Sequence, residues 1–366
     1  MSVVGRITVR ETHGIRRFLY PLSAELSLPP TFHTQKLGLV RQDRQPVPLQ
    51  VTPADQTDGW RSRLDFAISM APLETVELLL CTGQPDAKIN DPLRITPGER
   101  FRSQQQRFVI ELDRNAGLYD VVYDTVHHLR APGFVTRNGE QAALTNTSAY
   151  ATNLPLAARV IAASQYADGC NANTRAEITA CKSWVILTHT LDAPQPGDEI
   201  AFALPLTVTA PILTCDFGVG IYGKLQEGAI GNIVWQTDFP RTNTPQWSLL
   251  TAGRIDYRGT EPSDERYLPQ RWFHWIDRDK ALAVAIQRIP EDCQRMTVSL
   301  HAAGDVVISF KLRAAITGRA TFGVCYHFLN DIPPLAAATN PQSILLPPQV
   351  EATSNCRISH EEHGAA

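Results

Sequence analysis

Along most of the chain, apolar and polar residues alternate with a period of two, which is the pattern of β-strands that bury one face. Short alternating segments, separated by Gly, Pro, Asn or Asp, follow one another from residue 3 to about residue 330. No segment combines helical spacing with both an N-cap and a C-cap. We therefore expect an all-β fold, in which a small N-terminal antiparallel β-sandwich precedes a large antiparallel one.

Breaks in the alternation predict the domain limits. Residues 1–83 read as the small sandwich, and residues 84–103 contain several Pro and Gly residues that are typical of a linker. Residues 104–350 are expected to form the large sandwich. From residue 351 the sequence is polar and predicts a flexible tail.

Two details of the large sandwich bear on candidate residues. The alternation from Leu118 to Arg130 predicts one long strand, which would place His128 and Arg130 on the same face. Residues 140–155 are rich in Asn, Thr, Ser and Ala and are expected to form a loop.

A hairpin is predicted at residues 272–286, with a charged turn at residues 277–280. Alternation puts Trp272, His274 and Ile276 on one face of its first strand, and Phe273 and Trp275 on the other. Rings on both faces predict a strand that lies between two layers, or one that lines a groove for flat apolar surfaces such as those of sugars.

Composition narrows the class of partner. The chain has 366 residues and a mass of 40.5 kDa, which suits two domains. The net charge is −3 and the basic residues are scattered, so neither nucleic acid nor an anionic membrane is an expected partner. A homo-oligomer stays open.

Cysteine usage and the N-terminus bear on location. The chain has seven Cys residues, and this odd number favours reduced thiols and a cytoplasmic protein, although a bridge between Cys170 and Cys181 stays open. The N-terminus lacks the pattern of a signal peptide, and no apolar run reaches the length of about 18 residues that a membrane-spanning helix needs.

The order of elements resembles known carbohydrate-active proteins. Residues 8–28 look like the small leading β-domain of proteins similar to exo-acting rhamnogalacturonan lyases. From residue 108 onward the pattern resembles a galactose-mutarotase-like supersandwich: residues 108–113 with Gly117 resemble its opening hairpin, residues 176–191 its paired strands, and residues 272–286 a late hairpin near the groove. The resemblance implies a saccharide ligand, and this fold hosts mutarotases, polysaccharide lyases and non-catalytic domains.

A lyase that acts on a uronic acid needs a cation beside the carboxylate and a base for the neighbouring proton. His128 and Arg130 suit these roles, and the alternative is a solvated strand end or a hydrogen-bonded interior histidine. Arg175 and Glu177 share a strand face, where a structural ion pair is the alternative.

Two further histidines are candidate bases. His189 stands in an apolar strand, where a core histidine is the commoner outcome, but on a concave face it would suit the acid–base role of a mutarotase-like site. His274 lies between Trp272 and Ile276, where aromatic neighbours would desolvate it and keep it neutral; the alternative is a packed aromatic core.

The predicted substrate-binding residues are Trp235, Trp272, Arg258 and His327. The two tryptophans would stack on pyranose rings, although tryptophan in a large sandwich is usually core. No spacing predicts a metal site, and the chain has no P-loop, GxGxxG or GxSxG motif, so we expect no cofactor.

The leading hypothesis is a carbohydrate-active enzyme, specifically a lyase that acts by β-elimination on a uronate-containing glycan. Arg130 or Arg175 would hold the carboxylate, and His128, His189 or His274 would be the base. Two alternatives stay open: a non-catalytic carbohydrate-binding or assembly protein, and a mutarotase- or epimerase-like sugar isomerase that uses His189 with Glu177.

Overall fold

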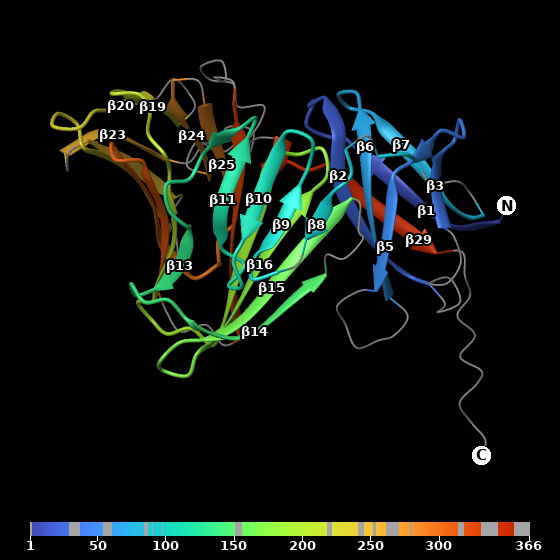
Figure 1. Ribbon diagram of the computed structural model, residues 1–366, viewed down its shortest axis with the longest axis horizontal. Helices are drawn as coiled ribbons and strands as arrows, with labels where there is room; N and C mark the ends of the chain where they lie inside the picture. Colours follow the sequence, from blue (N-terminus) through green and yellow to red (C-terminus); the bar gives the residue numbers. More distant parts are fainter. Residues whose placement is uncertain are drawn as a thin grey trace.

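The computed structural model describes residues 2–28, 37–53, 61–83, 87–89, 91–96, 98–150, 156–217, 222–240, 245–251, 254–260, 271–278, 280–313, 318–330 and 343–354. These residues form antiparallel sheets, so the expected all-β sandwich fold is confirmed (Figure 1). Residues 343–345 form a helical turn. Within the described residues, no helix has the length and apolar character needed to cross a membrane.

Two facing sheets make up the part of the molecule that contains the N-terminus (Figure 1). The five-stranded sheet has the order β29-β1-β7-β3-β4, and the three-stranded sheet has the order β2-β6-β5. Their bounds are β1 Val3–Arg10, β2 Arg17–Ser27, β3 Leu37–Arg41, β4 Pro46–Val47, β5 Leu49–Pro53, β6 Arg61–Met70, β7 Thr75–Thr82 and β29 Gln349–Ser354. Alternate side chains such as Ile7, Val9 and Phe66 point between the sheets and form their core.

Strand β29 corrects the expectation of a flexible tail from residue 351. Residues 349–354 pair with β1 in antiparallel register, from Arg10 with Gln349 to Gly5 with Ser354. The alternation of Val350 and Ala352 was too short to distinguish from a polar tail, because the strand needs the edge of a distant sheet to pair with. Residues 355–366 lie outside the described residues.

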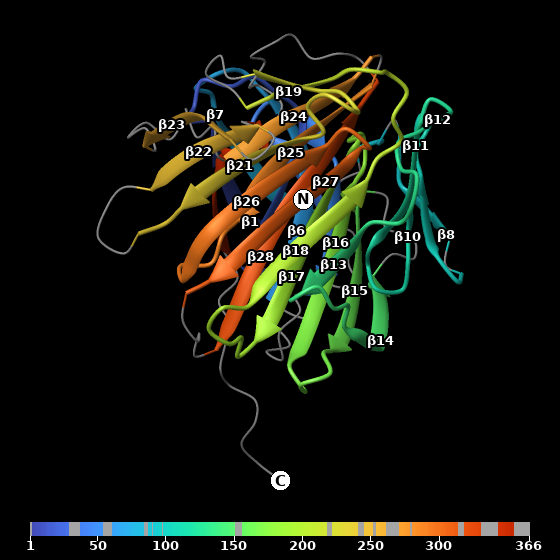
Figure 2. The same cartoon turned by 90° about the vertical axis from the view of Figure 1, so that its left-hand side faces the viewer.

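The larger part is built from a seven-stranded and a nine-stranded sheet. The seven-stranded sheet has the order β13-β18-β27-β26-β21-β22-β23, with β13 Phe134–Arg137, β18 Glu199–Pro205, β21 Asn232–Asp238, β22 Gln246–Thr251, β23 Arg254–Thr260, β26 Cys293–His301 and β27 Asp305–Leu312. The nine-stranded sheet has the order β14-β15-β16-β17-β28-β25-β24-β19-β20, with β14 Ala143–Tyr150, β15 Ala157–Gln165, β16 Asn171–Thr179, β17 Trp184–Asp192, β19 Leu213–Asp216, β20 Tyr222–Leu225, β24 Trp272–Asp277, β25 Lys280–Arg288 and β28 Arg319–Leu329. Figure 2 shows the long strands of this part side by side.

A third sheet extends the larger part. It has the order β12-β11-β10-β9-β8, with β8 Arg94–Thr96, β9 Phe101–Gln104, β10 Phe108–Leu112, β11 Leu118–Tyr123 and β12 Val126–His127. Residues 94–96 and 101–104 are therefore strands, which differs from the expected linker. Their alternation was short and interrupted by Pro97 and Gly98, which reads as a connection in sequence alone.

Two other segments differ from the expectations. The predicted strand from residue 118 to 130 stops at Tyr123, because Asp124 and Thr125 adopt positive φ angles and turn the chain into β12. Residues 143–150, expected within a loop, form β14 at the edge of the nine-stranded sheet. Polar composition does not exclude an edge strand, whose exposed side chains have no core to fill.

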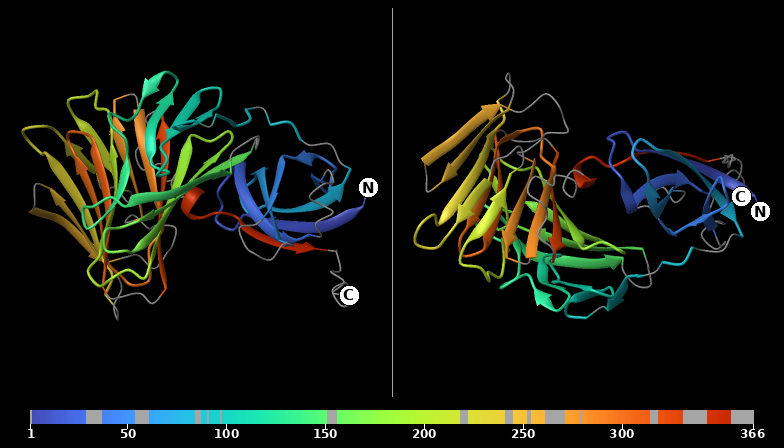
Figure 3. Two further views of the ribbon diagram at one scale, coloured as in Figure 1. Left: turned by 60° about the horizontal axis from the view of Figure 1, so that its bottom comes forward. Right: turned by 90° about the horizontal axis from the view of Figure 1, so that it is seen from above.

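One core lies between the nine-stranded and seven-stranded sheets, and a separate one lies within the N-terminal sheets. We therefore propose two domains, with the division near residues 84–103 expected from the sequence and with β29 added to the first. Figure 3 shows the helical turn at residues 343–345 between the two parts, just before the chain returns to β29. Cys170 and Cys181 are free thiols.

Candidate functional site

The nine-stranded sheet has two faces of different chemistry. Its inner face turns towards the seven-stranded sheet and carries apolar residues such as Phe273, Val284 and Tyr326. We call the opposite surface the outer face. Tyr20 of β2 and Ile344 of the helical turn pack on it, against Trp184, Ala285 and Cys325.

The predicted hairpin is confirmed. Strands β24 and β25 pair from Trp272 with Ala285 to Asp277 with Lys280, and Arg278 in the turn has a φ of 53°. All six residues of β24 are buried. The strand thus lies between two layers, with Phe273 and Trp275 in the inner core, as the alternation predicted.

A single row of side chains crosses the outer face. The pairing register aligns Trp184 with His327, His327 with Ala283, Ala283 with His274, and His274 with Asp216. We call these five residues the imidazole row. Because aligned residues of paired strands point to the same side of a sheet, strands distant in sequence bring two imidazoles, an indole and a carboxylate together.

Contacts within and beside the row are close. The ring of Trp184 lies 5.6 Å from that of His327, centre to centre, and the ring of Trp272, one row away, lies 5.4 Å from that of His274. His274 Nδ1 is 3.6 Å from Asp216 Oδ2. This separation is too long for a good hydrogen bond.

Buried polar atoms without partners are concentrated in this row. Within the described part of the chain, Trp184 Nε1, His327 Nδ1 and both ring nitrogens of His274 have no hydrogen-bond partner. Burial, with Lys182 and His274 nearby, lowers the pKa of His327 to about 3, so this imidazole is neutral at pH 7. Each such group costs about 1–3 kcal/mol when left unsatisfied, and an interior that keeps several in one place calls for an explanation.

An ion-pair cluster occupies another part of the outer face. Arg159 donates to Asp65 at 2.7 Å and to Glu177 at 2.9 Å, while Arg63 donates to the same two carboxylates at 3.0 and 3.4 Å. Arg175 approaches Glu177 at 3.9 Å. Asp65 and Arg63 come from β6, so the cluster ties the N-terminal sheets to β15 and β16.

The charges in this cluster determine its ionisation. Burial opposes ionisation of Glu177, but Arg159, Arg63 and Arg175 together hold its pKa below the ordinary value. Burial lowers the pKa of Arg175, and the neighbouring cations Arg63, Arg159 and Arg288 act in the same direction. A cavity of about 80 Å³ borders Arg63, Asp65 and Glu177. The predicted pair of Arg175 and Glu177 is therefore part of a larger network rather than an isolated pair.

His128 and Arg130 do not form the predicted pair. Strand β12 ends before them, and the two side chains have different surroundings. His128 is buried against Phe328, donates from Nε2 to Asn330 Oδ1 at 3.1 Å, and has its pKa lowered to about 4 by burial. Arg130 is exposed and pairs with Asp305. This arrangement supports the alternative of a hydrogen-bonded interior histidine.

His189 lies on the inner face and makes two contacts. Its Nδ1 is 2.9 Å from Thr174 Oγ1 and its Nε2 is 3.3 Å from the hydroxyl of Tyr166. Burial lowers its pKa to about 4. It borders a cavity of about 40 Å³ together with Asp113 and Phe134, but Glu177, its proposed partner, lies on the outer face.

The other predicted binding residues are distributed as follows. Trp235 is in the inner core, where its ring stacks between Phe217 at 5.1 Å and Trp247 at 4.6 Å. Both faces of its indole are covered, so it has no free surface for a sugar. Arg258 belongs to β23, and its side chain lies outside the described residues.

Five predicted residues thus share the outer face, namely Arg175, Glu177, Trp272, His274 and His327. Sequence reasoning missed Trp184 and Asp216, which complete the imidazole row. An acidic residue inside the apolar segment at residues 213–217 was the available signal for Asp216. In the described part of the chain, no three His, Cys, Asp or Glu side chains are arranged to hold a metal ion.

The imidazole row has the components of an acid–base site. His274 lies beside the Asp216 carboxylate, and neutral His327 can donate or accept through its two nitrogens. One strand separates the two histidines, which puts their β-carbons about 10 Å apart, with the methyl group of Ala283 between them. The buried rings of Trp184 and Trp272 contact His327 and His274, respectively.

Comparison with known proteins identifies the fold. No protein-family model and no curated protein sequence matches the chain. Among solved structures, it is similar to an α-mannosidase from Enterococcus faecalis V583, with a TM-score of 0.61, 10% identity, and coverage of 96% of this chain and 46% of the other. It is also similar to a glycosyl hydrolase family 38 protein from Enterococcus faecalis, with a TM-score of 0.58, 9% identity, and coverage of 98% of this chain and 48% of the other. The chain therefore has the β-sandwich fold found in these proteins and spans about half of their length.

Proposed function

We propose that the chain is a carbohydrate-active β-sandwich protein that binds a saccharide at the imidazole row. The row offers hydrogen-bonding nitrogens of His274, His327 and Trp184 and the carboxylate of Asp216, and the ring of Trp272 lies beside it. Sugars need such a combination, because each hydroxyl is both donor and acceptor while the ring presents apolar C–H faces.

One observation carries the proposal: four buried polar atoms of Trp184, His274 and His327 have no hydrogen-bond partner in the described part of the chain. Unsatisfied polar groups gathered in one row are expected where a ligand or ordered water completes the bonds. The likeness over nearly the whole chain to two glycoside-hydrolase structures supports a saccharide as this ligand.

The proposal is tested by titration calorimetry with neutral monosaccharides and methyl glycosides, α-mannosides included. We expect binding that His327→Asn weakens about tenfold or more, since a ligand hydrogen bond to the buried ring is lost. His127→Asn is the matched control, because His127 is an exposed histidine paired with Asp120 away from the row. A panel without any binder, or equal binding by the His327 variant, contradicts the proposal.

A second candidate function is a sugar isomerase of the mutarotase type. The specific observation is that His274 lies beside Asp216, while His327 lies two strands away on the same face. Ring opening at the anomeric carbon needs one group to accept the hydroxyl proton and another to protonate the ring oxygen. Polarimetry with α-D-galactose tests this: interconversion faster than in buffer, reduced at least about tenfold by Asp216→Asn, supports the isomerase. The uncatalysed rate together with intact binding supports a non-catalytic protein.

A β-eliminating lyase has weaker support from the geometry. The chemistry requires a cation at the carboxylate beside the base, but Arg130 pairs with Asp305 and the carboxylate nearest to Arg175 is Glu177. We expect no new ultraviolet absorbance of a conjugated double bond when uronate polymers are incubated with the protein. Such absorbance would restore the lyase hypothesis.

A further inference from the structure

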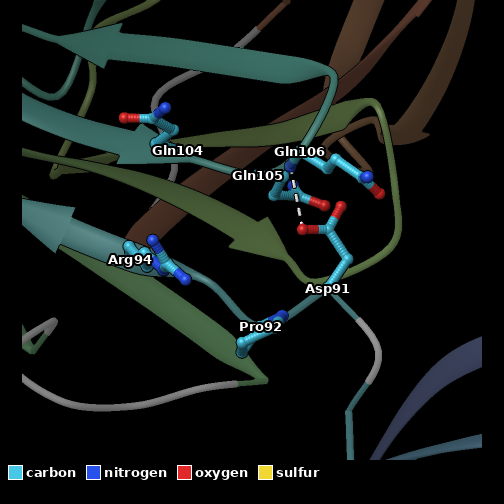
Figure 4. A pocket seen from close by; sticks show the side chains of 6 residues that line it. All are labelled: Asp91, Pro92, Arg94, Gln104, Gln105 and Gln106. Atoms are coloured by element: carbon cyan, nitrogen blue, oxygen red, sulfur yellow. Dashed lines mark hydrogen bonds between the residues drawn. The ribbon is translucent and has the colours of Figure 1, made fainter.

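A polar pocket of about 330 Å³ lies beside strands β8 and β9 (Figure 4). None of the residues of the imidazole row is among its described lining residues. Its lining consists of Asp91, Pro92, Arg94, Gln104, Gln105 and Gln106. The volume is at the lower end of the range for small-molecule sites. Apart from Pro92, every lining residue carries a hydrogen-bonding side chain, so the pocket fits a small and strongly polar ligand.

Part of the lining is held rigidly. Gln105 is 5% exposed, and its Nε2 donates to the carbonyl oxygens of Thr179 at 3.3 Å and Lys182 at 3.2 Å. The amide is thereby locked, while its Oε1 has no hydrogen bond within the described residues. Asp91 is held similarly, because its Oδ1 accepts from the backbone N–H of Gln106 at 2.8 Å. Figure 4 shows Asp91, Gln105 and Gln106 together at one end of the pocket. Polar groups that are fixed before binding lose little conformational entropy when a ligand arrives.

The other end of the pocket provides a free cation. Arg94 lies with Gln104 across from Asp91 (Figure 4), and in the described part of the chain no carboxylate pairs with its guanidinium. Its neighbours differ: Arg102 pairs with Glu111, and Arg107 with Asp124. Arg94 is thus available for the two parallel hydrogen bonds that a planar guanidinium makes to a carboxylate.

We propose that this pocket is a binding subsite for a sugar acid, with the carboxylate of a uronate on Arg94 and its hydroxyls on Asp91, Gln104 and Gln106. A carboxylate needs the cation, and hydroxyls need groups that both donate and accept, which primary amides do and the Asp91 carboxylate complements as an acceptor. The choice of a sugar acid as the ligand rests on the proposed saccharide function. The presence of the pocket and of an arginine without a carboxylate partner among the described residues is independent of that function. The proposed role is recognition of the carboxylate and hydroxyl groups of the ligand.

The test uses the full chain and calorimetric titration with D-galacturonate, D-galactose and acetate. We expect galacturonate to bind at least about tenfold more tightly than the other two, and Arg94→Gln to remove this preference, because the charge-assisted bidentate contact is lost. Arg102→Gln is the matched control, since this exposed arginine on the adjacent strand is already paired with Glu111. In spectra of ¹⁵N-labelled protein, the side-chain amide signals of Gln104 and Gln106 should shift with galacturonate.

The outcomes separate this subsite from the imidazole row. Galacturonate binding that survives His327→Asn but falls with Arg94→Gln supports the subsite, whether or not neutral sugars bind elsewhere. Measured in the His327→Asn variant, equal affinity for galactose and galacturonate or equal affinity for acetate and galacturonate overturns it, as does a preference that persists when Arg94→Gln is added. Loss of neutral-sugar binding in the His327 variant concerns only the proposed function.

Discussion

The two faces of strands β24, β25 and β28 differ in chemistry. The inner face packs Phe273, Val284 and Phe328 into the main core. The outer face buries His274 and Trp184 and half-buries His327, and both ring nitrogens of His274, Nδ1 of His327 and Nε1 of Trp184 lack hydrogen-bond partners among the described residues. Burial alone therefore does not distinguish a core from a site, whereas the balance of hydrogen-bond donors and acceptors does.

The largest expected difference in stability is between substitutions of two adjacent residues of β24 that point to opposite faces. Phe273→Ala should lower the free energy of unfolding by about 3–5 kcal/mol, because it leaves a cavity beside Phe217 in the inner core. His274→Leu, on the outer face, should change it by about 1 kcal/mol or less, since an apolar side chain replaces an unsatisfied polar one. Urea denaturation measures both. Equal destabilisation would mean that the outer face is ordinary core.

The second prediction concerns the ion-pair cluster of the outer face, where charged side chains contact partners of opposite charge. Asp65→Asn removes the negative charge that Arg159 and Arg63 contact, and should destabilise the fold by about 3 kcal/mol, as breaking a buried ion pair does. Asp238→Asn, which removes an exposed partner of Arg295, should change the stability by no more than about 0.5 kcal/mol. Denaturation midpoints of both variants test the difference, and similar values would show that the cluster is no stronger than a surface pair.

A smaller change in the free energy of unfolding is expected when the pH is lowered. Burial lowers the pKa of His128 and His189 to about 4, below the value of about 6.5 in an unfolded chain. The fold thus favours the neutral rings, so their full contribution is present above pH 6.5 and is lost as the pH falls from 6.5 towards 4. Between pH 7 and pH 5, each ring should lower the stability by about 1–2 kcal/mol. Urea midpoints of the wild type and His189→Gln measure this, and a variant with an unchanged pH dependence would contradict it.

The smallest change in stability is expected for Arg130, which the sequence predicted as a catalytic residue. Arg130→Gln should change the free energy of unfolding by about 0.5 kcal/mol or less, because its ion pair with Asp305 is exposed on both sides. Saccharide binding should stay at the wild-type level in calorimetry. A clear loss of binding would return Arg130 to the list of candidate site residues and weaken the assignment to the imidazole row.

The alternation of apolar and polar residues was sufficient to predict the strands whose two faces carry clearly different side chains. The hairpin of β24 and β25, with Trp272 and His274 on one face and Phe273 and Trp275 on the other, follows from alternation alone because the period of a strand is two. The pattern failed where a strand depends on a distant partner, as in β29, or where the backbone turns at non-glycine residues, as at Asp124 and Thr125.

The sequence by itself determined the all-β class, the face on which each residue of the long strands points, and the set of imidazoles and arginines from which a site can be built. Only the tertiary structure decided which of them meet. Cross-strand register joins Trp184, His327, His274 and Asp216 across strands far apart in the chain. Side-chain packing in the core places the rings of Phe217 and Trp247 against Trp235. The physical reason is that alternation specifies a side of a sheet, whereas the neighbours on that side depend on strand order, which forms through contacts between distant segments.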